Sequence, residues 1–414
     1  MLVDACVRCP VFDPQAEESR APWLVDMTRT ADLADRAVSE ISKAGQSTFW
    51  DRDHRCSVLM HLARQSVSGA RDLLYSLLGR LSDSDDVVGV EQIVELDGAD
   101  GLVFVARRLG QHLSEDADFW VDDTPVAALD EQTGTGTGLR ALEAVATSDA
   151  DVAQYLEALQ RPRGEERGHL KAPPRLGKGG AQAHEARMKA ITPLDVIALV
   201  RRDPKDRCFW LAGWGLHADS ASLETVFAAM LEETSPSRIS RFLRVFIRRG
   251  VPRFDDAILN WVDMDGGGGA AAVKVLAHLD EPRVRALALS RLTPPGSDPS
   301  ALPLLVSNFR PGDHRVVEDV LRPVDDESTR HTILYDALNV FEANPVPEAT
   351  AALCFVYEHT PCTHCRARAA RLLAGLATIP TWILEEAAFD ASKEMRKLAL
   401  SGSASSGRPT RGPS

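Results

Sequence analysis

The sequence predicts an all-α protein built from stacked helix hairpins. Apolar residues recur at helical spacing in segment after segment, while the apolar–polar alternation typical of strands is nearly absent. Many of the breaks between segments carry capping chemistry, as at Thr192-Pro193 and Thr360-Pro361, where a capping residue precedes a proline suited to the first helical position. Short breaks of this kind indicate that consecutive helices pair as hairpins.

Taken in chain order, the predicted helices fall at 31–44, 56–79, 86–96, 101–113, 139–159, 193–202, 222–233, 237–249, 254–262, 270–279, 283–292, 327–342, 346–358, 361–376 and 382–399. Residues 161–190 combine Gly, Pro and charge with few apolar side chains, which indicates a flexible basic loop or linker. The tail 401–414 is predicted to be disordered.

These boundaries divide the chain into five parts. At 414 residues the chain exceeds the ~250–300 at which one hydrophobic core stops growing, so it contains several domains or an elongated array. We predict an N-terminal arm at 1–27, an acidic helical array at 28–160, the linker at 161–190, a C-terminal array at 191–400 and the tail at 401–414.

Charge is unevenly distributed along an acidic chain. The net charge is −13, and residues 81–160 hold 18 Asp plus Glu against 3 Lys plus Arg. In contrast, residues 161–210 hold 12 basic against 6 acidic residues. A negative net charge disfavours nonspecific binding of nucleic acid along the whole chain, since such binding depends on a surplus of Lys and Arg that neutralises phosphates.

We expect neither a membrane-spanning segment nor the disulfide framework of a secreted protein. No apolar run approaches the ~20 residues that cross a bilayer, and Asp4 and Pro10 stand where a signal peptide needs basic and then apolar residues. Seven cysteines in so long a chain are typical of reduced thiols. We therefore expect a cytoplasmic protein.

Two segments resemble a known helical repeat. In 280–292, DEPRVRALALSRL, an Asp precedes a Val and a helical apolar stripe, and 390–399, DASKEMRKLA, is a weaker copy. Here the chain resembles bacterial HEAT-repeat (armadillo-like) proteins. The resemblance implies an α-solenoid in which Asp280 and Asp390 cap a helix or bind an Arg of a neighbouring repeat, and the apolar positions form the core between repeats.

An arginine stripe is the sharpest candidate binding feature. On a helical wheel of 237–249, Arg238, Arg241, Arg244 and Arg248 share an arc of about 120° opposite the apolar residues. The candidate residues are Arg238, Arg241, Arg244, Arg248 and Arg249. Guanidinium groups suit carboxylate and phosphate oxygens, so the stripe could bind an acidic or phosphorylated partner. The other interpretation, which we favour, is a solvated face paired with acids of adjacent repeats.

A second candidate is the pair Cys362 and Cys365, expected one turn apart on the first turn of a helix. Packing as small apolar side chains is the favoured interpretation. With His359, the pair has spacing that could begin a zinc site, and at a helix N-terminus it could also run redox chemistry. Only these three candidates lie close in sequence, so we expect no bound metal and no other cofactor.

No motif indicates catalysis. The glycine-rich run 133–138 lacks the preceding strand of a dinucleotide site and is expected to be a loop that caps a helix. We therefore predict a non-catalytic scaffold or adaptor that binds a protein on a concave helical-repeat surface. The alternatives are a nucleic-acid binder that uses the arginine stripe and a metal- or redox-responsive regulator that uses the C-x-x-C pair.

Overall fold

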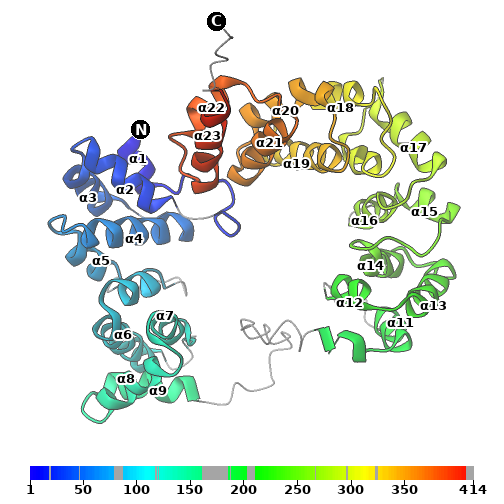
Figure 1. The fold of residues 1–414 in the computed structure, drawn as a ribbon. Helices are drawn as coiled ribbons and strands as arrows, with labels where there is room; N and C mark the ends of the chain where they lie inside the picture. The colour runs from blue at the N-terminus through cyan, green and yellow to red at the C-terminus, as the bar shows by residue number, and fades with distance from the viewer. Residues whose placement is uncertain are drawn as a thin grey trace, which may run out of the picture. The chain divides into compact units, whose positions relative to one another are not determined.

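The fold was analysed in a computed structural model (Figure 1). It describes residues 1–17, 20–45, 47–78, 87–116, 119, 121–160, 185–186, 188–202, 210–265, 267–294, 297–321 and 325–406. Every regular element within these residues is a helix, so the all-α prediction is confirmed. No helix among them has the length and apolar character needed to span a membrane.

The chain forms two compact units, Met1–His169 and Leu170–Ser414. The division falls inside the segment predicted to be a linker. Residues 161–184 and 187 lie outside the described residues, so the predicted flexibility of that segment stays a prediction.

Unit 1 is a bundle of nine described helices around one apolar core. They are α1 (Leu2–Val7), α2 (Ala21–Thr30), α3 (Ala34–Lys43), α4 (Phe49–Arg64), α5 (Ala70–Leu78), α6 (Val90–Glu115), α7 (Thr124–Thr133), α8 (Thr137–Ala146) and α9 (Ala150–Gln160). Helix α6 is broken at Gly98, whose φ of 59° lies in the left-handed region. This break separates the two helices predicted at 86–96 and 101–113.

Residues 1–27 are part of this core, which corrects the prediction of an N-terminal arm. Cys6 of α1 and Leu24 of α2 are buried among the core residues. His54 Nε2 lies 2.8 Å from the Ala5 carbonyl oxygen, and Arg55 Nε donates to the Val7 carbonyl oxygen at 2.7 Å. The first helix is therefore fixed to α4 by hydrogen bonds as well as by packing.

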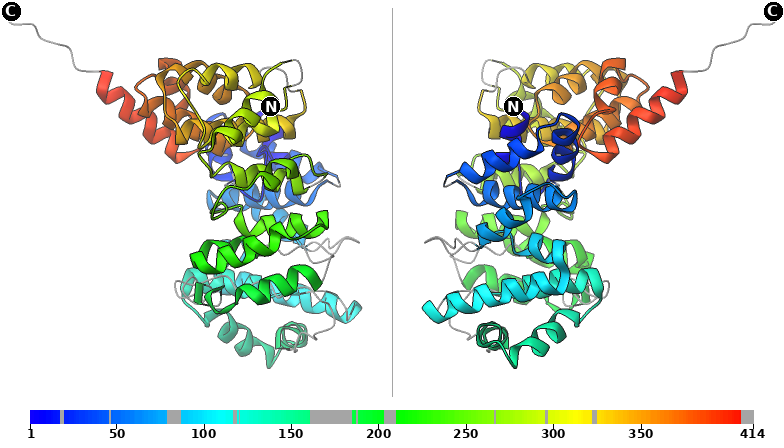
Figure 2. Two further views of the ribbon diagram at one scale, coloured as in Figure 1. Left: turned by 90° about the vertical axis from the view of Figure 1, so that its right-hand side faces the viewer. Right: turned by 90° about the vertical axis from the view of Figure 1, so that its left-hand side faces the viewer.

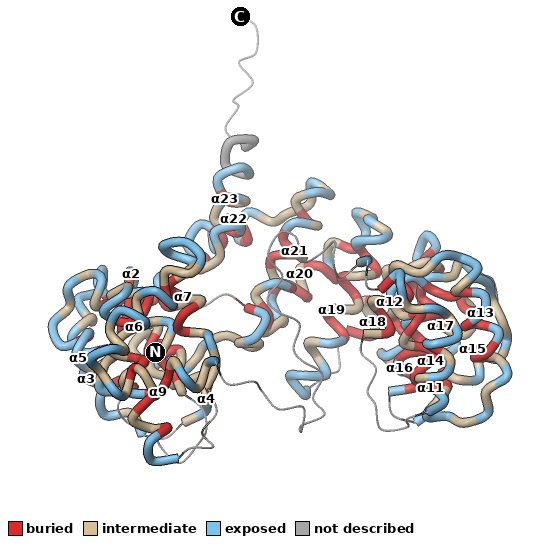
Figure 3. The backbone as a smooth tube through the Cα atoms, turned by 90° about the horizontal axis from the view of Figure 1, so that it is seen from below, coloured by how far each residue is buried: buried red, intermediate tan, exposed pale blue. Residues whose placement is uncertain are grey.

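Unit 2 is a succession of helices in chain order. They are α11 (Pro193–Arg202), α12 (Leu211–His217), α13 (Ser220–Leu231), α14 (Pro236–Phe246), α15 (Asp256–Trp261), α16 (Gly267–Leu276), α17 (Pro282–Leu292), η1 (Pro299–Leu305), α18 (His314–Leu321), α19 (Glu327–Ala343), η2 (Pro347–Ala349), α20 (Thr350–His359), α21 (Thr363–Gly375), α22 (Thr381–Ala387) and α23 (Lys393–Ser406). Figure 2 shows its green helices lying one above another. Buried residues gather on the facing sides of the helices in each unit (Figure 3).

Several elements of unit 2 differ from the sequence prediction. Helix α18 and the 3-10 helix η1 were not predicted, and η1 was concealed by its prolines Pro299 and Pro303. The predicted helix 382–399 is two helices, because the Asp390 carboxylate accepts a hydrogen bond from Ser392 N at 2.7 Å in a turn between them. Helix α23 also continues to Ser406, beyond the predicted start of the tail, and residues 407–414 lie outside the described residues.

The apolar stripes of the two repeat-like segments are buried. Val284, Ala288 and Leu292 of α17 are buried, as are Met395 and Ala399 of α23. Helix α17 packs against η1 and α18, which follow it, and α23 packs against α21 and α22, which precede it.

Candidate metal centre

The predicted arginine stripe does not form one exposed surface. Arg241 retains only 4% of its accessible area, and its Nε donates to the Ser237 carbonyl oxygen at 3.4 Å. Helix α14 packs against α11, α12, α13 and α16, so part of the face that a helical wheel assigns to arginine lies against neighbouring elements. Arg244 is also half-buried. The interpretation of Arg241 as a solvent-facing residue is therefore wrong.

The remaining arginines of the set lie nearer the surface. Arg238 Nη1 lies 3.7 Å from Glu233 Oε1, an acid in the turn just before α14 and not one of an adjacent repeat. Arg248 and Arg249 follow the end of α14 and are exposed, and Arg249 Nη1 donates to the Ala218 carbonyl oxygen at 2.5 Å. Arg248 and Arg249 are thus the members of the set that present charge to solvent.

Backbone amides of the glycine-rich run 133–138 are hydrogen-bonded to a side chain of the same unit. Gly136 N and Gly138 N each donate to the Asp130 carboxylate at 2.8 Å. These are the amide groups that a phosphate would need. The run therefore caps α8, as expected from the sequence.

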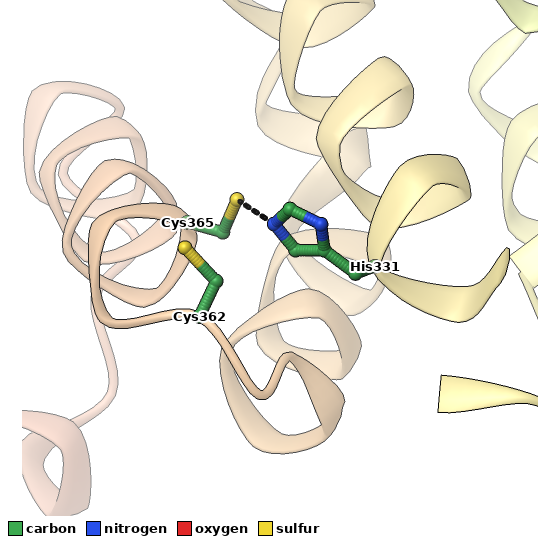
Figure 4. Close-up of side chains that lie close together, drawn as sticks. All are labelled: His331, Cys362 and Cys365. Carbon is green, nitrogen blue, oxygen red and sulfur yellow. Dashed lines mark hydrogen bonds between the residues drawn. The ribbon is translucent and has the colours of Figure 1, made fainter. Parts of the chain in front are cut away.

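The C-x-x-C pair of unit 2 meets a histidine from another helix (Figure 4). Cys365 lies in the first turn of α21, as predicted, whereas Cys362 is the N-cap residue. The helix therefore begins at Thr363 and not at Pro361, the start that the Thr360-Pro361 pair predicted. His331 comes from α19, which packs against α21. The two Sγ atoms and one ring nitrogen of His331 all lie within 4.8 Å of one another, and Cys365 Sγ is 3.5 Å from His331 Nε2.

Local structure explains why these side chains converge. Cys362 N donates to Thr360 Oγ1 at 3.3 Å, which fixes the turn that leads into α21. Asp326 caps α19 by accepting from Thr329 N at 2.8 Å and so sets the start of the helix that carries His331. Packing of α19 on α21 then brings the imidazole to the thiols.

The cluster is shielded from solvent and surrounded by ordered side chains. Cys362 and Cys365 retain 6% and 1% of their accessible area, and His331 is half-buried. The His331 ring lies 6.4 Å from the Tyr335 ring, and the Arg368 guanidinium lies over that tyrosine at 4.8 Å. Arg368 is itself held by Glu342, at 2.8 and 2.7 Å.

The protonation of Cys365 bears on the redox interpretation. Burial, and then the neighbouring Cys362 thiol, raise the pKa of Cys365 to about 12, while Arg368 acts in the opposite direction. A reactive C-x-x-C pair needs a lowered thiol pKa, because the thiolate is the nucleophile. The environment of Cys365 thus does not favour redox chemistry.

His359, the histidine that the sequence analysis grouped with the cysteines, is not in the cluster. It is exposed at the end of α20, stacks on Phe355 with ring centroids 4.0 Å apart, and its Nδ1 lies 2.9 Å from the Phe355 carbonyl oxygen. His331 was missed because it lies 31 positions before Cys362 and carries no local motif. No family model, curated protein or solved structure matches the chain.

Proposed function

We propose that the chain is a non-catalytic helical-repeat scaffold whose unit 2 is an α-solenoid of the HEAT kind. The observation that carries the proposal is the locality of its packing. Substantial packing in the described part of unit 2 joins elements no more than three places apart along the chain. A solenoid has this property, since each repeat contacts only its neighbours and leaves an extended surface for binding.

A ladder of ion pairs supports the same proposal. The pairs link residues in and just after α15 to α17, residues in and just before α17 to the segment before α18, α19 to α21, and α21 to the segment around the start of α23. They are Asp256–Arg283 (2.6 Å), Asp263–Arg291 (2.5 Å), Asp280–Arg310 (2.7 Å), Arg285–Asp313 (2.5 Å), Glu342–Arg368 (2.7 Å), Arg371–Glu394 (2.8 Å) and Arg366–Asp390. Asp280 and Asp390 both bind an arginine of a neighbouring element, as the HEAT resemblance implied.

The partner that fits this proposal is an acidic or phosphorylated protein segment. Most arginines of the ladder are neutralised by carboxylates, whereas Arg248 and Arg249 follow α14 with their charges exposed. Charge-assisted hydrogen bonds from a guanidinium are commonly worth ~1.5–3 kcal/mol each. Two such contacts would contribute more than tenfold to affinity.

The experiment is affinity capture followed by a measured dissociation constant. Full-length chain is immobilised, proteins enriched from the native cell lysate are identified, and the purified partner is titrated. We expect Arg248→Gln with Arg249→Gln to weaken binding at least tenfold. The control Arg315→Gln with Lys397→Gln removes two other exposed positive charges and should change affinity less than about twofold.

Two results would count against the proposal. One is a purified chain that captures no protein above background. The other is unselective retention of DNA or RNA whose log affinity falls with log salt at a slope near −0.9 per phosphate neutralised, which is the signature of nucleic-acid binding.

A further inference from the structure

We propose that His331, Cys362 and Cys365 form a binding site for one Zn²⁺ ion per chain, with water as the fourth ligand. This proposal is independent of the scaffold function. It reverses the expectation from sequence that no metal binds, because the third donor is supplied by α19 and not by His359.

The separations of the donor atoms suit a tetrahedral zinc ion. Zinc–sulfur and zinc–nitrogen bonds of about 2.3 and 2.1 Å place sulfur and nitrogen about 3.6 Å apart and two sulfurs about 3.8 Å apart. Cys365 Sγ and His331 Nε2 are 3.5 Å apart, and no pair of donor atoms is separated by more than 4.8 Å. Side-chain rotations that close the longest separation by about 1 Å therefore complete the geometry.

The donor types select the ion. Two thiolates and an imidazole suit Zn²⁺, whereas Mg²⁺, Ca²⁺ and Mn²⁺ prefer carboxylate, carbonyl and water oxygens. Two thiolates also balance the charge of a divalent cation, so the loaded site is neutral overall. A neutral site can be as buried as Cys362 and Cys365 are without the large free-energy cost of an uncompensated charge.

The ion itself drives thiolate formation, because a thiol that coordinates a zinc ion loses its proton to the charge of the metal. Binding would release the two thiol protons to solvent, and the zinc ion replaces them as the positive charge at the site. No oxidant or reductant is needed.

The three donors come from two helices, so a bound ion would cross-link those helices. His331 belongs to α19 and the cysteines to the start of α21, so the ion would join two packed helices that are separated along the chain by η2 and α20. Ligand binding to the folded chain alone stabilises it. Zinc would therefore raise the resistance of this part of unit 2 to unfolding. With three protein donors among the described residues, the fourth position remains for water.

The test is a Co²⁺ titration of reduced, metal-stripped, full-length chain without a histidine tag. Tetrahedral Co²⁺ bound by thiolates gives visible ligand-field bands and a sulfur-to-cobalt charge-transfer band. We expect both to saturate at one equivalent per chain and to disappear when Zn²⁺ is added. Zinc should also protect Cys362 and Cys365, but not Cys354, from alkylation detected by mass spectrometry.

Matched variants assign the signal to the site. Cys362→Ser, Cys365→Ser and His331→Ala should each weaken Co²⁺ binding at least about tenfold. Cys354→Ser and His359→Ala remove the same residue types from α20, outside the cluster, and should leave the titration unchanged. Circular dichroism of each variant checks folding, and the alkylation pattern of the unmodified chain keeps the test valid if a variant unfolds.

The proposal is wrong if the reduced chain takes up less than one tenth of an equivalent of Co²⁺. It is also wrong if Cys362→Ser with Cys365→Ser retains the full thiolate spectrum, or if His359→Ala abolishes the spectrum and His331→Ala does not. Alkylation of Cys362 and Cys365 that proceeds in the zinc-free chain and is not slowed by Zn²⁺ would overturn it independently.

Discussion

Arg285 of α17 and Asp313, which precedes α18, form a bidentate ion pair in which Arg285 Nη1 and Nη2 donate to the Asp313 carboxylate at 2.5 and 2.9 Å. Arg285 Nη1 also donates to the Asn308 carbonyl oxygen at 2.7 Å. The Asp313 side chain is 8% exposed, so the pair is shielded from water on one side. It joins α17 to the next helix of the array.

Asp313→Ala should destabilise unit 2 by about 2–3 kcal/mol, because it leaves the Arg285 charge partly buried without its carboxylate. The matched control is Asp280→Ala, since Asp280 pairs with Arg310 in the same ladder but is 67% exposed. An exposed pair contributes about 0–1 kcal/mol. Urea denaturation followed by circular dichroism measures both, and equal losses for the two variants would contradict the role of burial.

Gly215→Ala should destabilise unit 2 by at least about 3 kcal/mol. A Cβ atom at Gly215 of α12 would lie 1.8 Å from the Val245 carbonyl oxygen of α14, so the two helices would have to separate. Gly375→Ala is the control, because a Cβ atom there meets nothing within 4 Å. That change should be neutral or stabilise by up to about 1 kcal/mol. A stable Gly215→Ala chain in thermal melts would show that α12 and α14 do not approach this closely.

Asn308→Ala should cost about 2–4 kcal/mol, because one fully buried side chain satisfies three backbone groups. Its Oδ1 accepts from Glu281 N at 3.0 Å, and its Nδ2 donates to the carbonyl oxygens of Leu279 and Leu304 at 2.8 and 2.9 Å. Asn260→Ala, at an exposed position of α15, should change stability by less than about 0.5 kcal/mol. The comparison is made from urea midpoints, and a loss below 1 kcal/mol for Asn308→Ala would argue against this network.

Asp336→Asn should stabilise the chain above pH 6. Burial raises the pKa of the Asp336 carboxyl to about 6, and Lys274 opposes the shift. Since the unfolded-state pKa is ~3.9, the folded chain binds more protons between about pH 4 and 6, and stability falls as pH rises through that window. At pH 7.5 the variant should gain at most about 3 kcal/mol.

The control for this pH dependence is Asp326, the N-cap residue of the same helix, because its pKa is shifted in the opposite direction. Hydrogen bonds from the Thr329 side chain and backbone lower the pKa of Asp326, so its ionised form contributes stability that is lost as pH falls through the folded-state pKa. Asp326→Asn should therefore lower the free energy of unfolding at neutral pH but not at acid pH. Asp336→Asn should raise the free energy of unfolding at neutral pH but not at acid pH. Thermal melts from about pH 2 to 8 distinguish the two, because the contribution of Asp326 is lost only below about pH 4. Parallel profiles would contradict both assignments.

Helical class and much of the core could be predicted from the sequence because they depend on local periodicity. Val284, Ala288 and Leu292 recur at the spacing of one helix face, and that face is buried. The prediction failed where the residue types pointed to a different structure. In η1, for example, Pro299 and Pro303 suggest a loop, but the segment is a 3-10 helix. Residues 1–27 look polar and irregular in sequence, yet Cys6 and Leu24 are buried in unit 1.

In the candidate site, too, some features could be predicted from local sequence and others depend on packing. Cys362 is the N-cap residue of α21 and Cys365 lies in its first turn, a placement that depends on the short spacing of the two cysteines, although the helix begins two residues later than Thr360-Pro361 predicted. His331 joins them only because α19 packs on α21, and Arg241 is buried only because other helices cover α14. Spacing along a chain determines which residues share a helix face, whereas the identity of the element covering that face depends on packing between segments distant in sequence.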